Sequence, residues 1–281
     1  MHLKYYGTAA AEGIPGMFCT CPVCRESLKR GGRNLRTRSQ ALVDGRLLID
    51  FPADTYDHML RGGLDLPSIQ HVLITHSHED HLYAQDFENR KPGFCYVGEV
   101  GKHYEEPLRV YASAKAMETV RFHDVTKLEA RGVTELHEIE AYQPFMVEDY
   151  TVTALTANHE ATAGPVFYAI QRAGKAMLYA NDTGIFPEAT WDYLARSGLR
   201  FDYVSLDCTG GGRTDYRGGH MCLSVNAEVR ERLVSIGCAG PATIFCAHHF
   251  SHNGGLIHDD LVTEATKFGF LVSYDGMEIE F

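Results

Sequence analysis

The segment His76-Ser77-His78-Glu79-Asp80-His81 places three imidazoles beside two carboxylates, directly after the apolar run 71–75. Ordinary core packing does not explain so many polar side chains at one strand end, because each would need its own buried partner. Imidazole nitrogen is a good ligand for zinc and other first-row divalent ions, and a carboxylate can bind or bridge such ions. The segment therefore predicts a site for one or two metal ions. A solvated histidine-rich loop is the alternative.

A second group of potential metal ligands lies near the N-terminus, where Cys19, Cys21 and Cys24 fall within six residues. This spacing lets three thiolates converge on one tetrahedral zinc ion and leaves one vertex for a fourth ligand. His252 is an attractive fourth ligand because it would share one loop with His249 after the predicted strand 243–247. A set of buried or redox-active thiols is the alternative, since C-x-x-C is also a redox motif.

The histidine segment resembles the H-x-H-x-D-H hallmark of the metallo-β-lactamase superfamily, and the superfamily's other ligands follow in order. They match His159 after the run 151–157, Asp182 in YANDTG and His249 in FCAHHFSH. The neighbouring His248 is expected to face the opposite way. The resemblance implies two catalytic divalent ions, zinc or manganese, and a hydroxide held between them as the nucleophile. The implied ligands are His76, His78 and His159 for one ion, Asp80, His81 and His249 for the other, and Asp182 as the bridge.

The resemblance narrows to the phosphoribosyl cyclic phosphate phosphodiesterase branch, the PhnP type. This narrower resemblance rests on several motifs: G-T-x-x-x-x-G-x-P before C-x-C-x-x-C, then LIDF (48–51), LDC (206–208), GGH (218–220) and the ending DGMEIEF. In that branch a late histidine completes a structural zinc site, which maps onto His252 beside Cys19, Cys21 and Cys24. A histidine that binds no metal serves as general acid or transition-state donor, which maps onto His220.

Residues near His220 bear on how a phosphate would be held. An imidazole suits acid catalysis because its pKa lies near neutrality. Arg213 and Arg217 lie on the same glycine-rich loop, 209–219, and could meet a phosphate through paired donors. Solvated loop arginines are the alternative for both.

The expected function is that of a metal-dependent phosphodiesterase for a small cyclic or simple phosphodiester, with His220, Asp182 and Asp80 in catalysis. Hydrolysis of a lactone, thioester or amide by the same centre is one alternative. A non-hydrolytic cofactor-biosynthesis protein of the PqqB type is another, although the catalytic motif of that group is characteristically incomplete and is complete here. The tRNase Z enzymes normally rely on an RNA-gripping arm that this sequence does not show.

Buried strands must bring these scattered residues together. The apolar runs 71–75, 109–113, 151–157, 203–207 and 243–247 each deliver polar residues at their C-terminal ends, where α/β sites form. Hairpins are predicted at 40–50, 166–180 and 270–281, two of them from the turn signals Asp44-Gly45 and Asp275-Gly276. Helices are predicted at 53–62, 114–121, 187–197, 224–236 and 259–268.

Strands and helices interleave without a repeat or linker, which favours one domain over residues 1–281, including the cysteine-rich loop 19–24. The expected fold class is α/β, a metallo-β-lactamase-like αββα sandwich of two mixed β-sheets flanked by helices.

Composition limits the partners. The 281 residues include 26 Lys and Arg against 37 Asp and Glu, a formal charge of −11. Nucleic acid and anionic membranes attract clustered basic residues, so neither is expected as a partner. The apolar runs are too short to cross a bilayer, and the first residues lack a signal-peptide pattern. We therefore expect a cytoplasmic protein with a small-molecule phosphodiester substrate, and we leave a homodimer open as its assembly.

Overall fold

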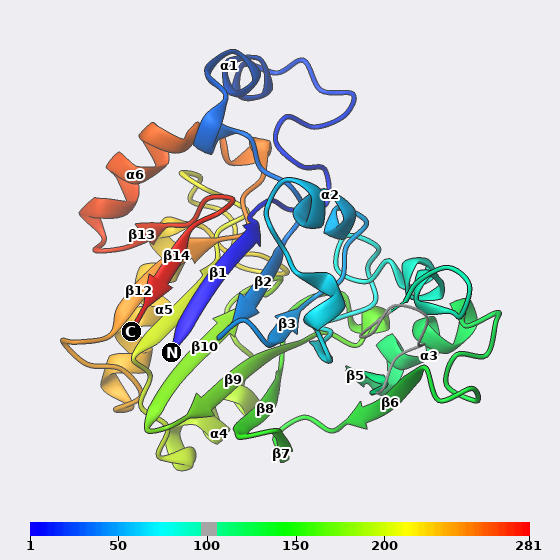
Figure 1. The fold of residues 1–281 in the computed structure, drawn as a ribbon. Helices are drawn as coiled ribbons and strands as arrows, with labels where there is room; N and C mark the ends of the chain where they lie inside the picture. Colours follow the sequence, from blue (N-terminus) through cyan, green and yellow to red (C-terminus); the bar gives the residue numbers. More distant parts are fainter. Residues whose placement is uncertain (97–105) are drawn as a thin grey trace.

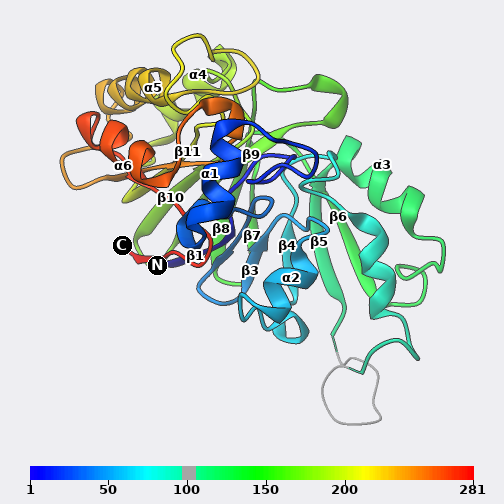
Figure 2. The same cartoon turned by 90° about the horizontal axis from the view of Figure 1, so that it is seen from above.

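The computed structural model describes residues 1–96 and 106–281. Two mixed β-sheets of seven strands each pack face to face, and helices cover their outer faces (Figure 1). Seen from above, α4, α5 and α6 lie on one side of the molecule, and α2 and α3 lie on the other (Figure 2). The predicted αββα sandwich is therefore confirmed.

The first sheet is built mainly from the N-terminal half of the chain. In spatial order its strands are β14 (Glu278–Glu280), β1 (His2–Gly7), β2 (Gln40–Val43), β3 (Leu47–Ile49), β4 (His71–Leu73), β5 (Leu108–Ser113) and β6 (Thr134–Ile139). The second sheet, in the same sense, contains β13 (Leu271–Val272), β12 (Ile244–His248), β11 (Tyr203–Asp207), β10 (Lys175–Ala180), β9 (Val166–Arg172), β8 (Tyr150–Thr156) and β7 (Pro144–Val147).

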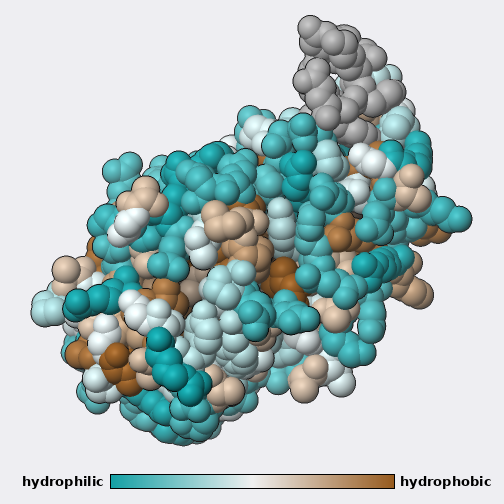
Figure 3. Space-filling model, turned by 90° about the horizontal axis from the view of Figure 1, so that it is seen from below, coloured by the Kyte–Doolittle hydropathy of each residue, from teal (hydrophilic) through white to brown (hydrophobic). Residues whose placement is uncertain are grey.

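Six α-helices are found in the described part of the chain. They are α1 (Pro22–Arg30), α2 (Thr55–Leu60), α3 (Ala114–His123), α4 (Glu188–Ser197), α5 (Leu223–Ser235) and α6 (His258–Lys267). None of the described helices is long and apolar enough to span a bilayer. On the face seen from below, hydrophobic residues are interspersed among hydrophilic ones (Figure 3), as is usual for the exposed surface of a folded domain.

The core forms because alternate residues of each strand point to opposite faces of its sheet. Between the sheets, side chains such as Tyr5 and Ile49 meet Val152 and Tyr168. On the outer faces, β5 packs on α3 and β12 packs on α5. Burying an apolar side chain of this size contributes roughly 1.5–3 kcal/mol. Both sheets are thus fixed rigidly enough to hold polar groups at their edges.

Strand direction explains where those polar groups gather. β3, β4, β5 and β6 run parallel, and so do β10, β11 and β12. The carboxyl ends of parallel strands meet at the same edge of a sheet. The segments that follow β10, β11 and β12 therefore emerge side by side, and the segment after β4 in the other sheet meets them, as the grouping of His81 with Asp182 and of His81 with His249 shows.

Two of the predicted hairpins are confirmed, since β2 pairs antiparallel with β3 and β9 with β10. The predicted hairpin at 270–281 is wrong. β13 joins β12 in the second sheet, whereas β14 joins β1 in the first. The turn is real, with Gly276 at a φ of 88°, but the Asp275 carboxylate accepts hydrogen bonds from Thr8 and Thr37. Each short strand pairs with an open sheet edge instead of with the other.

Helix α1 was not among the predicted helices. It begins at Pro22, and the Cys21 thiol at its N-cap accepts a hydrogen bond from the backbone N–H of Cys24 at 3.4 Å. Proline is favoured in the first turn because its missing N–H is not needed there. The cysteine spacing that indicated a metal site thus also starts a helix.

Candidate metal centres

The first group of candidate ligands is His76, His78 and His159. The first two follow β4, and His159 follows β8. Nε2 of His76 and Nε2 of His159 lie 3.0 and 3.3 Å from Nδ1 of His78. These three ring nitrogens lie within 4.8 Å of one another, close enough to contact one ion.

The second group joins Asp80 and His81 to His249, which follows β12. Nε2 of His81 lies 3.2 Å from Asp80 Oδ2. Asp182, which follows β10, stands between the groups. Its Oδ2 is 2.8 Å from His81 Nε2 and 2.9 Å from His249 Nε2, while its Oδ1 faces His159 Nε2 at 3.8 Å. Asp182 is therefore placed to bridge two ions.

Three atoms of this cluster test whether metal ions fit. Nε2 of His81, Nε2 of His249 and Oδ2 of Asp182 are buried and make no hydrogen bond of acceptable geometry, although they face one another. A buried polar atom without a partner costs roughly 1–3 kcal/mol. Imidazole nitrogen and carboxylate oxygen together suit zinc and manganese. The residues present therefore fit divalent ions.

Asp50 orients the middle of this cluster and was missed as a site residue. It is fully buried after β3, and its carboxylate accepts from Nδ1 of His81 at 2.7 Å and from the backbone N–H and hydroxyl of Thr75, both at 2.8 Å. Such outer partners fix the histidine tautomer and leave the other nitrogen free for a metal. The available signal was an aspartate ending an apolar strand.

Asp207 plays a comparable part at the end of β11. Its Oδ2 lies 2.9 Å from Nδ1 of His220 and 3.3 Å from Nδ1 of His249. The Thr209 hydroxyl lies between the two rings, 3.2 Å from the first and 2.9 Å from the second. His220 is thus held with Nε2 free, and its Nδ1 lies 3.9 Å from Asp182 Oδ1. Asp207 and Thr209 had not been assigned to the site.

The charges of the cluster favour metal binding in exchange for protons. Burial alone would lower the pKa of His249, but the carboxylates of Asp182 and Asp207 raise it to about 10. The pKa of His81 is likewise raised, against its burial, by Asp182 and Asp80. Burial would raise the pKa of Asp182, yet His249 and His81 hold it well below the usual range. Imidazole ligands must be neutral, so an ion would displace these protons.

The two arginines of the loop 209–219 are already paired. The Arg213 guanidinium donates twice to Asp215, at 3.0 and 2.8 Å. Arg217 donates twice to Glu228 on α5, at 2.7 and 2.8 Å. Both pairs are exposed at the surface. A phosphate would have to compete with these carboxylates for either guanidinium.

His248 is directed away from the cluster, as its position beside His249 predicted. Its Nε2 lies 2.8 Å from the Ser39 hydroxyl, and its Nδ1 lies 3.0 Å from the Ser273 hydroxyl. Both nitrogens thus have partners inside the sandwich. His249 lies just after β12 with a φ of 60°, and this left-handed backbone lets its side chain face the metal ligands.

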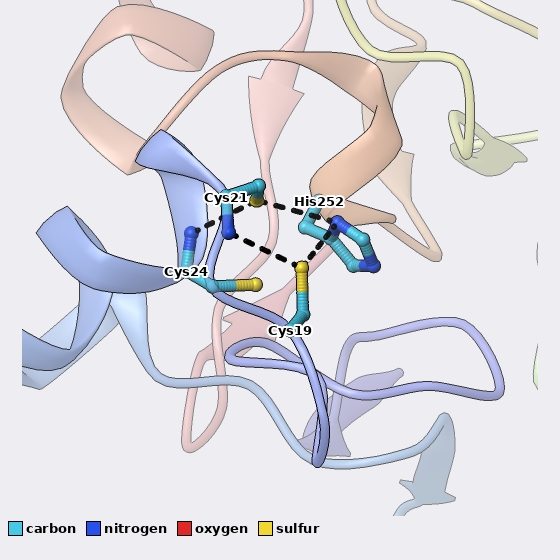
Figure 4. Close-up of side chains that lie close together, drawn as sticks. All are labelled: Cys19, Cys21, Cys24 and His252. Atoms are coloured by element: carbon cyan, nitrogen blue, oxygen red, sulfur yellow. Dashed lines mark hydrogen bonds between the residues drawn. The ribbon is translucent and has the colours of Figure 1, made fainter.

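The thiol site is assembled from α1 and the segment after β12 (Figure 4). The thiols of Cys19, Cys21 and Cys24 and a ring nitrogen of His252 lie within 4.8 Å of one another. His252 Nδ1 is 3.7 Å from the Cys19 sulfur and 3.5 Å from the Cys21 sulfur. Backbone N–H groups donate to all three sulfurs, at 3.3 to 3.4 Å, including that of Gly16 to Cys24.

The four side chains fit one tetrahedral zinc ion. All cysteines in the described residues are free thiols, so no disulfide competes for them. Burial would raise the pKa of Cys21, but hydrogen bonds with Cys24, Cys19 and His252 together lower it to about 7. Cys24 is different, because burial and its neighbouring thiols raise its pKa to about 12. A zinc ion would supply the positive charge that keeps all three as thiolates.

A β-sandwich with helices outside and a histidine–aspartate cluster at the strand ends defines a class of metal-dependent hydrolase. The chain matches the family model described as the Beta-lactamase superfamily domain over residues 46–250, and it belongs to that superfamily. The matched span contains the whole histidine–aspartate cluster, which consists of His76, His78, Asp80, His81, His159, Asp182 and His249. The thiol site has Cys19, Cys21, Cys24 and His252 outside it.

Solved structures show the same fold over the whole chain. Zinc-bound PqqB from Methylobacterium extorquens is 20% identical, with a TM-score of 0.77 and full coverage of both chains. A diphosphatase from the PhnP family is 21% identical, with a TM-score of 0.74, covering 100% of this chain and 96% of that one. The short form of human tRNase Z is 16% identical, with a TM-score of 0.61 and coverage of 100% and 99%. No curated protein sequence gives a match.

Proposed function

We propose that this member of the superfamily is a metal-dependent phosphodiesterase that hydrolyses a small cyclic or simple phosphodiester. The observation that carries the proposal is the placement of His220 beside Asp182, with Asp207 holding its Nδ1 at 2.9 Å. A cleaved phosphodiester needs both activated water and a proton for the leaving alkoxide. The cluster contains candidates for both tasks.

The proposed ligands divide as the sequence predicted, with His76, His78 and His159 for one ion and Asp80, His81 and His249 for the other. When bound, two divalent ions supply positive charge at the developing transition state and lower the pKa of water. Asp182 would join the two ions, and Asp50 would keep the His81 ring in its ligating tautomer.

His220 would deliver the proton that the leaving group needs. Burial opposes its charged form, but Asp207 raises the pKa of His220 above its usual value. This shift favours the protonated imidazole, the form that a general acid needs. Its Nε2 would donate to the alkoxide oxygen as the bond between that oxygen and phosphorus breaks. Asp207 acts as a positioning residue, because it contacts His220 rather than substrate.

The proposed structural zinc is a separate part of this assignment. Cys19, Cys21, Cys24 and His252 would hold it, and its role would be to tie the N-terminal loop to the segment after β12. The phosphate chemistry named for the PhnP-family diphosphatase supports a phosphorus substrate. At 21% identity that likeness concerns the fold, and the site geometry carries the proposal.

A second candidate, hydrolysis of an uncharged lactone, thioester or amide, is favoured by the pairing of both loop arginines. Arg213 and Arg217 are neutralised by Asp215 and Glu228, so neither is free to hold an anion. In the phosphodiesterase proposal the metal ions themselves must attract the monoanionic diester. The two candidates therefore differ in the charge of the substrate.

The deciding experiment pairs metal analysis with substrate assays. Protein purified without added metal is analysed for ions per chain and then assayed with bis(p-nitrophenyl) phosphate, a ribose cyclic phosphate, a lactone and a thioester. Three ions per chain with turnover of either phosphodiester is the expected result. A full set of ions with turnover of the lactone or thioester alone would overturn the phosphodiesterase proposal in favour of the second candidate.

A further inference from the structure

Glu12, on the loop between β1 and α1, contacts the thiol site's histidine, His252, and the residues on either side of it. Its Oε1 accepts a hydrogen bond from the Ser251 hydroxyl and lies 3.5 Å from Asn253 Nδ2. The same oxygen lies 3.6 Å from His252 Nε2. Glu12 is half-buried, so these contacts are partly shielded from water. In the described part of the chain it is the only carboxylate ion-paired with His252.

We infer that Glu12 is a positioning residue for the thiol site, setting the tautomer and orientation of His252 for metal binding. This inference rests on the proposed assignment of that site to a structural zinc. His252 presents Nδ1 to the sulfurs, so binding of a zinc ion by Nδ1 requires the ring proton on Nε2, the atom that faces Glu12. A carboxylate beside the non-ligating nitrogen favours that tautomer and makes the ligating nitrogen more basic.

The distance fixes the nature of this contact. At 3.6 Å the pair is longer than a normal hydrogen bond, so the attraction is mainly electrostatic. The closer contact of Glu12 is with Ser251, whose hydroxyl also accepts from the backbone N–H of Asn253 at 3.0 Å. Glu12 therefore acts on His252 both through charge and through the turn that carries it.

The backbone places Glu12 independently of any metal. The N–H of Ala10 donates to the carbonyl of Phe250, and the N–H of Phe250 donates to the carbonyl of Thr8, both at 2.9 Å. These bonds fix the loop that carries Glu12 beside the segment that carries His252. The backbone of Gly16 also lies near the ring, since a Cβ added there would come within 3.5 Å of Cδ2 and Nε2 of His252.

Cobalt binding can test the inference without an activity assay. Thiolate ligands give bound Co²⁺ an absorption that nitrogen and oxygen ligands do not, so the thiol site can be titrated separately from the histidine–aspartate cluster. The variants are Glu12→Ala, which removes every contact, and Glu12→Gln, which keeps an acceptor for Ser251 but no charge. Glu26→Gln is the matched control, because Glu26 is an acid on α1 paired with Arg30.

We expect Glu12→Ala to weaken Co²⁺ binding at the thiol site by roughly 10–100-fold, the usual effect of removing an outer partner. Glu12→Gln should weaken it less, and Glu26→Gln should not change it. Unchanged thiol-site affinity in both Glu12 variants would overturn the inference. Glu12→Gln keeps the turn and should fold even if Glu12→Ala does not, which can be checked by circular dichroism.

The titration of the wild-type protein tests the assignment of the thiol site to a zinc ion separately from the role of Glu12. Thiolate–cobalt absorption that is present in the wild type and lost in Cys21→Ser is the result the zinc assignment requires. Absence of that absorption in the wild type would overturn both the assignment and the role of Glu12. Its presence with unaltered affinity in the Glu12 variants would overturn the role of Glu12 alone.

Discussion

The histidine–aspartate cluster and the thiol site are built in different ways. The cluster takes its ligands from segments that follow four strands, and Asp50, Asp182 and His249 adopt positive φ angles of 67°, 48° and 60°. None of the four thiol-site residues has a positive φ. Left-handed backbone in residues other than glycine is costly, of the order of 1 kcal/mol or more each, and it concentrates at functional sites. Backbone strain therefore accompanies the placement of side chains in the cluster, whereas the side chains of the thiol site are placed without it.

The two sites also differ in what holds them without metal. The cluster has buried atoms with no partner, and Asp50 and Asp207 orient its histidines from behind. The thiol site is closed locally by the N-terminus of α1, where backbone N–H groups already point at sulfur. We propose that the cluster serves chemistry and that the thiol site stabilises the fold. The predictions below test this division.

The largest effect is expected from Asp182→Asn. An amide cannot bridge two cations as a carboxylate does, so we expect kcat/KM to fall roughly 10³-fold or more, the equivalent of several kcal/mol. Bound catalytic metal should fall with it, while the melting temperature stays near that of the wild type. Kinetics, metal analysis and thermal unfolding measure the three quantities. Asp192→Asn, an exposed change on α4, is the control; full activity and metal content in Asp182→Asn would show that the bridge is misassigned.

His220→Gln should lower kcat by roughly 10²–10⁴-fold, the usual contribution of a general acid. Metal content should stay unchanged, because His220 is not among the proposed ligands. Steady-state kinetics with metal analysis tests this. A substrate whose leaving group is already a weak base, such as p-nitrophenolate, should lose much less. An equal loss for good and poor leaving groups would contradict the role of proton donor.

Cys21→Ser should produce the opposite pattern. Loss of the thiol-site ion is expected to cost a few kcal/mol of folding free energy, which lowers Tm by roughly 5–10 °C in a chain this long. The kcat of the folded, metal-loaded fraction should change by less than about threefold, because the cluster is formed by other residues. Thermal unfolding and active-site-normalised kinetics measure the two. Cys95→Ser is the control; lost activity with an unchanged Tm would contradict the stabilising role.

A smaller, pH-dependent effect is expected at His58, a buried residue that supports the Asp50 side of the cluster. Its Nδ1 lies 2.6 Å from Gln40 Oε1, and Gln40 donates to the Asp50 carbonyl at 2.9 Å. Burial lowers the pKa of His58 to about 4. The unfolded chain takes up this proton near pH 6.5, so stability is full above that pH and falls as pH drops toward 4, by at most roughly 3 kcal/mol.

His58→Gln should flatten that part of the pH profile, because glutamine keeps hydrogen bonding without titrating. Urea unfolding at pH 7 and pH 5 measures the difference. If wild type and variant lose the same stability between these pH values, His58 is not the group responsible.

The fold and the residues brought together were largely predictable because their signals are local. The spacings H-x-H-x-D-H and C-x-C-x-x-C, and the apolar runs before them, lie within a few residues of each other. Because polar residues after parallel strands gather at the same edge of a sheet, His159, Asp182 and His249 were expected to lie together, as they do in the structure. The outer partners were harder to predict, since Asp50 and Glu12 act across 31 and 240 residues of sequence.

By itself, the sequence determined which side chains are available as ligands and that strands would deliver them to one edge. Tertiary structure alone decided that β13 and β14 separate into different sheets, that Asp207 faces both His220 and His249, and that Arg217 pairs with Glu228. Residue type and spacing set local geometry through covalent structure and strand periodicity. Partner choice depends on which sheet edges and side chains meet after the two sheets pack, and that is fixed by long-range contacts.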